Sequence, residues 1–262
     1  MIYQNNIRQF YEVEVAYSRF NNLRTFSTGL PSEMRVIEQA GMTVFVDPTR
    51  PYDNRILGLN TDNEVHLETV LGEYPEPIAP YLELEPEAVS QVLSNRLVSL
   101  GYLPVLSLEY LALPLERYDA AQCPTDIHVE RWGPERADDF LALLKTSGVQ
   151  CSDEIWALKR QFYCTEQFRC FVAMVDEQPC AWATSFIEQG TALLANAYTQ
   201  ETSRGRGCQT ALLHARARDA QSLGCTDLLT DVLPQSQSAL NCKKLGFSTL
   251  TVRSIWERTV AG

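Results

Sequence analysis

The sequence has 262 residues, of which 45% are hydrophobic and 21% are charged, and its formal net charge is -11. This length allows one large or two ordinary domains, and the apolar content excludes a disordered chain. The acidic balance argues against a broad nucleic-acid surface, which needs clustered Lys and Arg, and suits cationic ligands. No run reaches 18 apolar residues, and residues 1–20 lack the apolar stretch of a signal peptide. We therefore expect a cytoplasmic protein without a membrane partner.

The chain contains eight cysteines, without a C-x-x-C pair or a neighbouring cluster of histidines. Zinc sites need ligands at short, regular spacings, so this pattern predicts reduced thiols and no metal site. The cysteines are Cys123, Cys151, Cys164, Cys170, Cys180, Cys208, Cys225 and Cys242.

A polar stretch at residues 116–126, which includes Pro124, separates two apolar-rich halves of the chain. Domain boundaries fall in such segments, so the sequence predicts two domains, at residues 1–122 and 126–262. Periodicity in the first half predicts a helix at the start, strands at 42–46 and 55–59, helices at 62–73 and 86–100, and a strand at 103–113.

The second half has a regular pattern of apolar residues. It predicts a strand at 127–132, helices at 135–147 and 152–164, strands at 170–176, 179–189 and 191–199, a helix at 208–223, a strand at 227–233, a helix at 236–245 and a strand at 247–256. Hairpins followed by alternating strands and helices indicate an α/β fold with a mixed sheet flanked by helices. Apolar spacing along helix 208–223 predicts an exposed basic face that carries His214, Arg216 and Arg218.

Two segments 145 residues apart resemble each other. Residues 95–102 and 240–247 each read as a helix that ends in Leu-Gly-aromatic and continues into an apolar strand. This echo indicates an internal duplication. An alternative interpretation is that both are ordinary helix ends, because glycine often terminates helices.

The loop Arg204-Gly205-Arg206-Gly207 lies between a predicted strand and a predicted helix. Glycines allow a tight turn, so that the free amides and the positive dipole end of the helix point at an anion such as a pyrophosphate. The loop is neither G-x-G-x-x-G nor a Walker A sequence, which disfavours those nucleotide-binding folds.

This loop resembles the coenzyme A loop of the GNAT acetyltransferase superfamily, whose pattern is Arg or Gln, two residues, Gly, one residue, then Gly or Ala. Arg204 and Gly207 match, whereas Gln209 departs from the pattern at the last position. Residues 238–247 resemble the family's closing motif, in which an Asn-bearing helix and a Gly-Phe turn flank the pantetheine arm. The resemblance covers essentially the whole second half.

The resemblance implies a GNAT-like fold for residues 126–262 and direct transfer of an acetyl group from acetyl-CoA to an amine through a tetrahedral intermediate. If the first half shares the ancestry of the second, as the echo indicates, its lack of a glycine-basic loop implies a degenerate GNAT-like domain that has lost coenzyme binding. Asn241 is expected to hydrogen-bond the coenzyme. The expected coenzyme-binding residues are Ala197, Tyr198, Thr199, Arg204, Gly205, Arg206, Gly207, Cys208, Gln209, Thr210, Ser238 and Asn241.

In this chemistry the amine must lose a proton, the oxyanion must be stabilised, and the departing thiolate is best protonated. The resemblance places the oxyanion donor at a backbone amide of residues 197–199. Many relatives place a tyrosine four residues before the glycine of the Gly-Phe turn to protonate the thiolate, but this chain has Cys242 there. Tyr198 is the other candidate acid, and both residues also fit a purely structural role.

The general base is not singled out by the sequence. Glu154, Glu188, Glu201 and Asp231 lie near strand ends or the loop, and each also fits a solvated surface charge. A water chain is an alternative to all four.

The sequence therefore predicts an N-acetyltransferase that acts on a small-molecule or peptide amine, with acetyl-CoA as co-substrate. The sequence does not identify the acceptor, and it is compatible with a homodimer. Two alternatives stay open: a coenzyme A-binding sensor or scaffold without turnover, and a lysine acetyltransferase acting on proteins.

Overall fold

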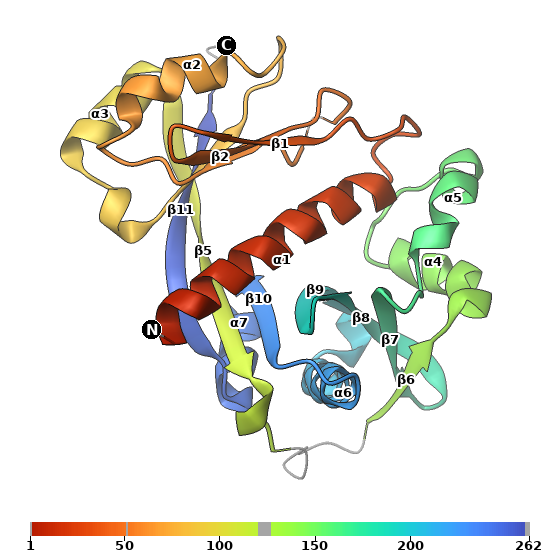
Figure 1. The fold of residues 1–262 in the computed structure, drawn as a ribbon. Coiled ribbons are helices and arrows are strands. Elements are labelled where there is room, and N and C mark those ends of the chain that lie inside the picture. Colours follow the sequence, from red (N-terminus) through yellow and green to blue (C-terminus); the bar gives the residue numbers. More distant parts are fainter. Residues whose placement is uncertain (1, 51, 120–126, 260–262) are drawn as a thin grey trace.

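One mixed β-sheet runs through the molecule (Figure 1). The computed structural model describes residues 2–50, 52–119 and 127–259, and side chains from residue 10 onward. Within these ranges the sheet has eleven strands in the order β1-β2-β3-β4-β11-β5-β10-β9-β8-β7-β6. None of the helices in the described ranges is both long and apolar enough to cross a membrane.

The first half of the chain contains three α-helices and five strands in its described part. The elements are α1 (Ile2–Arg24), β1 (Arg35–Gln39), β2 (Met42–Val46), β3 (Arg55–Leu57), α2 (Leu67–Leu71), β4 (Tyr81–Leu84), α3 (Gln91–Ser99) and β5 (Tyr102–Pro114). Short 3-10 turns precede α2 and α3, so the two predicted helices there are shorter than expected. The apolar periodicity of the sequence did not predict β1 or β4.

The second half follows the predicted order closely. Its elements are β6 (His128–Trp132), α4 (Ala137–Lys145), α5 (Asp153–Lys159), β7 (Phe168–Val175), β8 (Gln178–Glu188), β9 (Thr191–Thr199), α6 (Cys208–Ser222), β10 (Asp227–Val232), α7 (Gln237–Leu245) and β11 (Ser248–Arg258). The prediction of a mixed sheet flanked by helices is confirmed.

The two halves exchange their last strands. β5, from the first half, lies between β10 and β11 and is antiparallel to both. β11, from the second half, lies between β5 and β4. Each half also has a parallel pair, β3 with β4 and β9 with β10, followed by a helix and the exchanged strand. This matching topology supports the duplication read from residues 95–102 and 240–247. The predicted boundaries at 122 and 126 fall within 120–126, outside the described residues.

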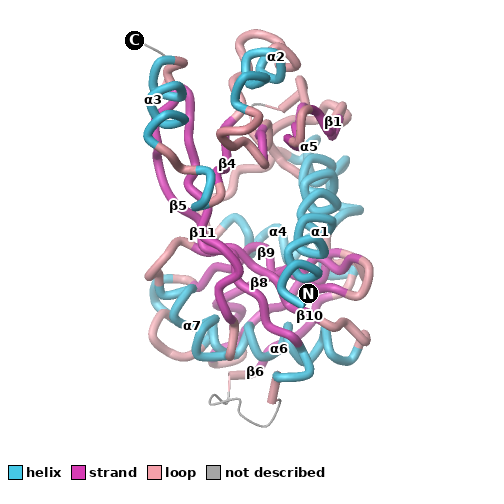
Figure 2. The backbone as a smooth tube through the Cα atoms, turned by 60° about the vertical axis from the view of Figure 1, so that its left-hand side comes forward, coloured by secondary structure: helices cyan, strands magenta, loops and turns pink. Residues whose placement is uncertain are grey.

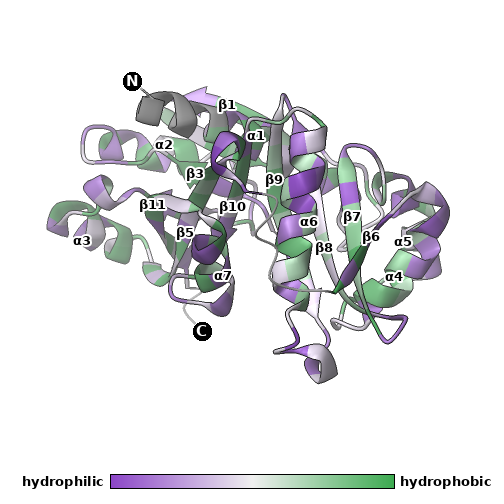
Figure 3. Cartoon of the chain, turned by 90° about the horizontal axis from the view of Figure 1, so that it is seen from below, coloured by the Kyte–Doolittle hydropathy of each residue, from purple (hydrophilic) through white to green (hydrophobic). Residues whose placement is uncertain are grey.

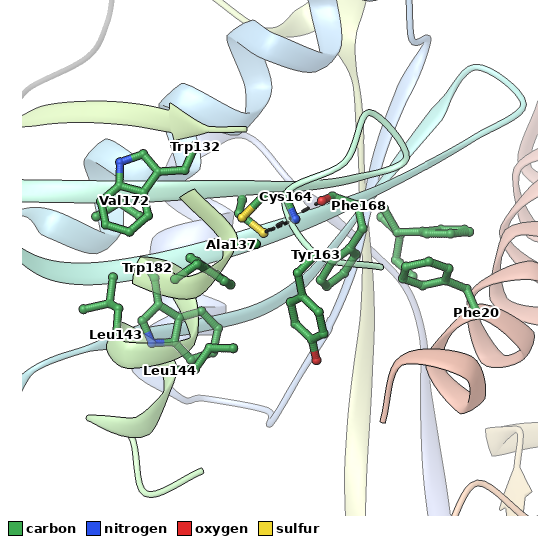
Figure 4. Close-up of a cluster of buried hydrophobic side chains, with 14 of the residues drawn as sticks. Phe20, Trp132, Ala137, Leu143, Leu144, Tyr163, Cys164, Phe168, Val172 and Trp182 are labelled. Carbon is green, nitrogen blue, oxygen red and sulfur yellow. Dashed lines mark hydrogen bonds between the residues drawn. The ribbon is translucent and has the colours of Figure 1, made fainter. Parts of the chain in front are cut away.

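Helices cover both faces of the sheet. α6 and α7 contact each other, and both lie across one face of the second-half strands (Figure 3). α1, α4 and α5 pack on the opposite face (Figure 2). There Phe20 of α1 contacts Phe168 of β7, with ring centroids 5.2 Å apart (Figure 4). The first-half helix α1 therefore forms part of the second half's core.

A buried group of charges joins α1 to strands from both halves. Arg55 on β3 contacts Glu14 on α1 at 2.9 Å and Glu83 on β4 at 2.7 Å. Arg253 on β11 contacts the same two carboxylates at 3.1 Å. Tyr110 of β5 donates a hydrogen bond to Glu83 at 2.8 Å. Opposite charges and hydrogen bonds compensate for the loss of hydration.

The predicted basic exposed face of α6 is wrong for two of its three residues. His214 and Arg216 are buried, and only Arg218 is exposed. The Tyr118 hydroxyl lies 3.0 Å from Nδ1 of His214, and Arg216 donates to the carbonyl oxygen of Thr184 at 3.3 Å. α6 is enclosed by the sheet, α7 and the segment around Tyr118, so His214 and Arg216 face protein instead of solvent. Helical periodicity of one segment cannot reveal such neighbours.

Candidate active site

A groove opens where β9 and β10 separate. The two strands pair only over residues 191–193 and 227–229, and beyond them the strands splay apart. The groove has a volume of about 570 Å³ and lies between β9, α6 and α7. Its lining residues are Ala197, Tyr198, Thr199, Ser203, Arg204, Gly205, Gly207, Cys208, Gln209, Thr210, Leu212, Gln237, Ser238 and Asn241. Eleven of the twelve predicted coenzyme-binding residues are thus brought together.

The glycines of the loop allow the backbone to enter α6 in an unusual conformation. Gly205 and Gly207 have φ angles of 76° and 89°, in the left-handed region that side chains disfavour. Gly207 is the N-cap of α6 and supplies no side chain to cap it. The first amides of the helix, at residues 208–210, therefore have no intrahelical acceptor. These amides and the positive end of the helix dipole lie beside the groove, an arrangement that suits an anion.

The two arginines of the loop differ in position. Arg204 lines the groove, and its side chain contacts the carbonyl oxygen of Thr199 at 3.4 Å and Glu201 at 3.5 Å. Arg206 is the predicted coenzyme-binding residue that does not line the groove, and it lies 3.5 Å from Asp176. Only Arg204 directly adds positive charge to the groove.

Gln209, which departs from the family pattern, is held against α7. Its side-chain nitrogen donates to Ser238 at 2.8 Å, and its oxygen accepts from Asn241 at 2.6 Å. Asn241 in turn accepts from Gln237 at 2.9 Å. This network accommodates the larger side chain and also occupies the polar atoms of Asn241.

Backbone amides of β9 point into the gap beside β10. The N–H groups of Asn196 and Gln200 are directed to β8, where they donate to Thr184 and Cys180. Successive N–H groups of a strand alternate between its two edges. The amides of Ala197 and Thr199 therefore face the opposite edge, whereas that of Tyr198 faces β8.

The two candidate acids have different surroundings. Tyr198 lies on the splayed part of β9, lines the groove and contacts the Trp182 ring at a centroid distance of 6.4 Å. Cys242 is buried on the inner face of α7 and does not line the groove. Burial raises the pKa of its thiol to about 11, although the charge of Arg216 lowers it. Of the two, only Tyr198 lines the groove, and its ring packs with Trp182 against the core on the α1 face of the sheet.

Asp231 differs from the other three candidate carboxylates. It lies on β10 just beyond the last residue paired with β9, and it lines a cavity of about 160 Å³ with Glu14 and Glu83. Its side chain is solvent-accessible, but the surrounding protein displaces much of the water. This desolvation, followed by the charges of Glu14 and Glu83, raises the pKa of Asp231.

The remaining carboxylates lie away from the strand gap or face solvent. Glu154 is exposed on α5, and Glu201 is exposed beside Arg204. Glu188 pairs with Thr191 at the end of β8 that is remote from the gap.

A second cavity, of about 540 Å³, lies on the opposite face of the sheet beneath the end of α1. Trp182 and Thr184 of β8 and Asn196 of β9 contribute to it, together with Asn21 and Arg24 of α1. Sequence reasoning missed this cavity, because its residues come from segments more than 100 positions apart and carry no shared motif.

The cysteines give no sign of a metal site. Seven of the eight are free, and Cys123 lies outside the described residues. Within the described ranges, no group of three or more His, Cys, Asp or Glu is arranged to hold a metal ion.

Comparisons with known proteins concern the family of the second half and the fold of the whole chain. Residues 130–247 match the sequence model of the acetyltransferase (GNAT) family. A GCN5-related N-acetyltransferase from Kribbella flavida is similar in structure, with a TM-score of 0.63 and 16% identity over 95% of this chain and 95% of that one. A functionally unknown conserved protein from Staphylococcus epidermidis ATCC 12228 has a TM-score of 0.62 and 14% identity, over 90% and 98% of the two chains.

A tandem GNAT protein from the clavulanic acid biosynthesis pathway is also similar in structure. Its TM-score is 0.55 and its identity 12%, over 84% of this chain and 79% of that one. At such identities the likeness concerns the fold, and it extends over both halves of the chain. No curated protein matches the sequence.

Proposed function

Because residues 130–247 match the sequence model of the acetyltransferase (GNAT) family, we propose that the protein transfers an acetyl group from acetyl-CoA to the amine of a small-molecule or peptide acceptor. The observation that carries this proposal is the anion-binding start of α6, which opens on the groove beside the β9–β10 gap. The dipole and free amides of a helix N-terminus suit a pyrophosphate.

The residues of the groove fit the parts of the coenzyme. The amides of 208–210 and the Arg204 guanidinium would hold the pyrophosphate. Ser238 and Asn241 would flank the pantetheine arm, with Asn241 leaving its partner Gln209. The thioester carbonyl would then reach the gap between the strands, where the amides of Ala197 and Thr199 can stabilise the oxyanion.

We assign the two proton transfers to ionisable side chains of the strands that border the gap. The acceptor amine must lose a proton as it attacks the thioester, and Asp231 lies beyond the gap with a raised pKa that suits a general base. Tyr198 would protonate the departing thiolate, with Cys242 the weaker candidate. Both roles are parts of the proposal.

The first half is assigned no coenzyme. Its segment between β3 and β4 corresponds by topology to the segment between β9 and β10. There, residues 58–64 read Gly-Leu-Asn-Thr-Asp-Asn-Glu, with acids where the second half has arginines. Phosphates would be repelled. We propose that this half instead forms the acceptor side through α1.

Calorimetric titration with acetyl-CoA tests the proposal. Wild type is expected to bind, whereas Arg204→Ala and Gly207→Asp weaken or abolish binding. Arg206→Ala is the matched control and should bind nearly as well, because Arg206 lies outside the groove. Absence of binding to wild type would refute the acyltransferase assignment. Binding without thioester cleavage across a wide amine panel would indicate a sensor.

A further inference from the structure

The cavity beneath α1 has an unusual lining for an acidic protein. The chain carries 33 Asp and Glu, yet none of the residues that line this cavity is acidic. Its walls are aromatic, aliphatic and neutral polar side chains, with Arg24 as the single charged group. Cavities of this size accommodate small molecules. Their chemistry is set by the few polar groups present.

Arg24 has no carboxylate partner within ion-pair distance among the described residues. Its two terminal nitrogens donate to the hydroxyls of Tyr163, at 3.1 Å, and Tyr17, at 3.0 Å. Its guanidinium carbon lies 4.6 Å from the centroid of the Phe168 ring. Its Nε is buried and has no hydrogen-bond partner. A positive charge is thus held at the cavity wall by neutral groups alone.

A second donor of the same cavity is also unsatisfied. Trp182 is only 6% exposed, and its indole nitrogen has no hydrogen-bond partner. Indole and guanidinium nitrogens can only donate hydrogen bonds. A buried donor without an acceptor is unfavourable. A molecule in this cavity is therefore expected to supply acceptor oxygens, and beside Arg24 these oxygens would be anionic.

One side of the cavity lies next to the β9–β10 gap, where acetyl transfer is proposed to take place. Thr184 and Asn196 line the cavity and are joined by the hydrogen bond from the Asn196 amide to the Thr184 hydroxyl. Asn196 directly precedes Ala197, whose amide faces the β9–β10 gap. Asn21 lines both this cavity and the neighbouring acidic one that contains Asp231. An acceptor lying here would have an anion-binding wall on one side and carboxylates on the other.

We propose that the acceptor is an amine that also carries a carboxylate, as an amino acid does. Its carboxylate lies against Arg24 and the Trp182 N–H, its apolar part lies against the aromatic walls, and its amine faces the gap and Asp231. This inference rests on the proposed function for the identity of the reaction. The binding site itself rests on the cavity.

The first test uses the wild-type chain and matched acceptors. Thioester cleavage is measured with glycine, leucine and phenylalanine, each beside its primary amide and its decarboxylated amine. We expect kcat/KM to be about tenfold to a hundredfold higher for an acid than for both analogues, mainly through KM, as for hydrogen bonds to a charged group. The amide is less basic and the decarboxylated amine more basic than the acid, so basicity cannot explain a preference over both. Equal values for the three would overturn the proposal.

The second test changes the protein. Arg24→Met should remove the preference for the acid, Arg24→Lys should retain part of it, and Arg19→Met, on the exposed side of α1, should leave it unchanged. Thermal melts check folding. An Arg24→Met protein that folds and still prefers the acid would overturn the proposal; if it does not fold, the wild-type comparison decides.

A binding measurement separates this inference from the proposed function. Saturation-transfer NMR compares N-acetylphenylalanine with its amide on wild type and Arg24→Met, without acetyl-CoA. If no amine promotes thioester cleavage, the proposed function fails. Acid-selective binding that depends on Arg24 would still support the carboxylate site, whereas binding without selectivity, or no binding, would overturn it.

Discussion

Replacement of Asp231, the proposed general base, should lower the rate of acetyl transfer. Asp231→Asn keeps the shape but cannot take a proton, so we expect kcat/KM to fall by about 10²- to 10⁴-fold. The raised pKa of Asp231 also means that the wild-type rate falls with decreasing pH earlier than an ordinary aspartate would allow. Glu188→Gln, at the remote end of β8, is the matched control.

The pH profile distinguishes a base from a residue that only shapes the cavity. Loss of a base removes the acidic limb of kcat/KM set by that group, whereas a structural change lowers the rate equally at every pH. Unchanged activity of Asp231→Asn at its optimum would leave a water chain as the base.

His214 makes the folded protein sensitive to mild acid. Burial, followed by the charge of Arg218, lowers the pKa of His214. The unfolded chain, in which histidine has a pKa of about 6.5, then binds the proton more readily than the folded chain. Stability should therefore decrease as pH falls below about 6.5. The urea midpoint between pH 7.5 and 5.5 measures this loss.

Two histidine variants separate this effect from other titrations. His214→Gln should show a smaller loss of stability over that range, whereas His66→Gln, at an exposed position, should behave like wild type. Equal losses in wild type and both variants would contradict the assignment to His214.

At the scale of elements, periodicity predicted nearly every strand and helix of the second half. Most of those elements have seven or more residues with apolar side chains at regular spacing, which gives a clear signal. The strand β1 has no fully buried residue, and β4 has four residues that follow a proline-rich stretch, so neither shows a clear alternation. The loop of residues 204–207 was recognisable because its chemistry is local. The cavity beneath α1 was not, because only the fold brings α1 beside β8 and β9.

The conformation of the phosphate loop gives a prediction for a matched pair of glycines. Gly205 and Gly190 have φ angles of 76° and 75°, and a Cβ at either would meet nothing within 4 Å. Replacing either with Ala should cost about 1–2 kcal/mol through the left-handed backbone alone. Only Gly205→Ala should also weaken acetyl-CoA binding, since Gly190 lies in the β8–β9 turn. Chemical denaturation and calorimetry measure the two effects. Equal acetyl-CoA affinities in the two variants would argue against this loop as the phosphate site.

At the scale of the whole molecule, strand exchange makes the two halves depend on each other. β5 belongs to the first half but pairs with two strands of the second, and β11 belongs to the second half but pairs with two strands of the first. Unfolding of either half therefore breaks strand pairing in the other. The sequence pointed to a duplication, but pairing of β5 with β10 and β11 requires residues more than 100 positions apart. No local pattern carries that information.

Arg253 tests this dependence. It lies on β11 and contacts Glu14 and Glu83, which belong to the first half. Arg253→Met leaves Arg55 as the one cation among the described residues in contact with these two buried carboxylates, so we expect a loss of about 3–5 kcal/mol in the free energy of unfolding. Because the halves share one sheet, unfolding should stay a single transition, monitored by circular dichroism and tryptophan fluorescence together.

The matched control for Arg253 is an ion pair at the surface. Arg96→Met breaks the contact with the exposed Glu68, and such pairs contribute about 0–1 kcal/mol. A similar small loss for Arg253→Met would mean that the buried charges do not hold the halves together. Two separate transitions in the variant would show that the first half can unfold while the second keeps its structure. Strand exchange alone would then not make the two halves unfold together.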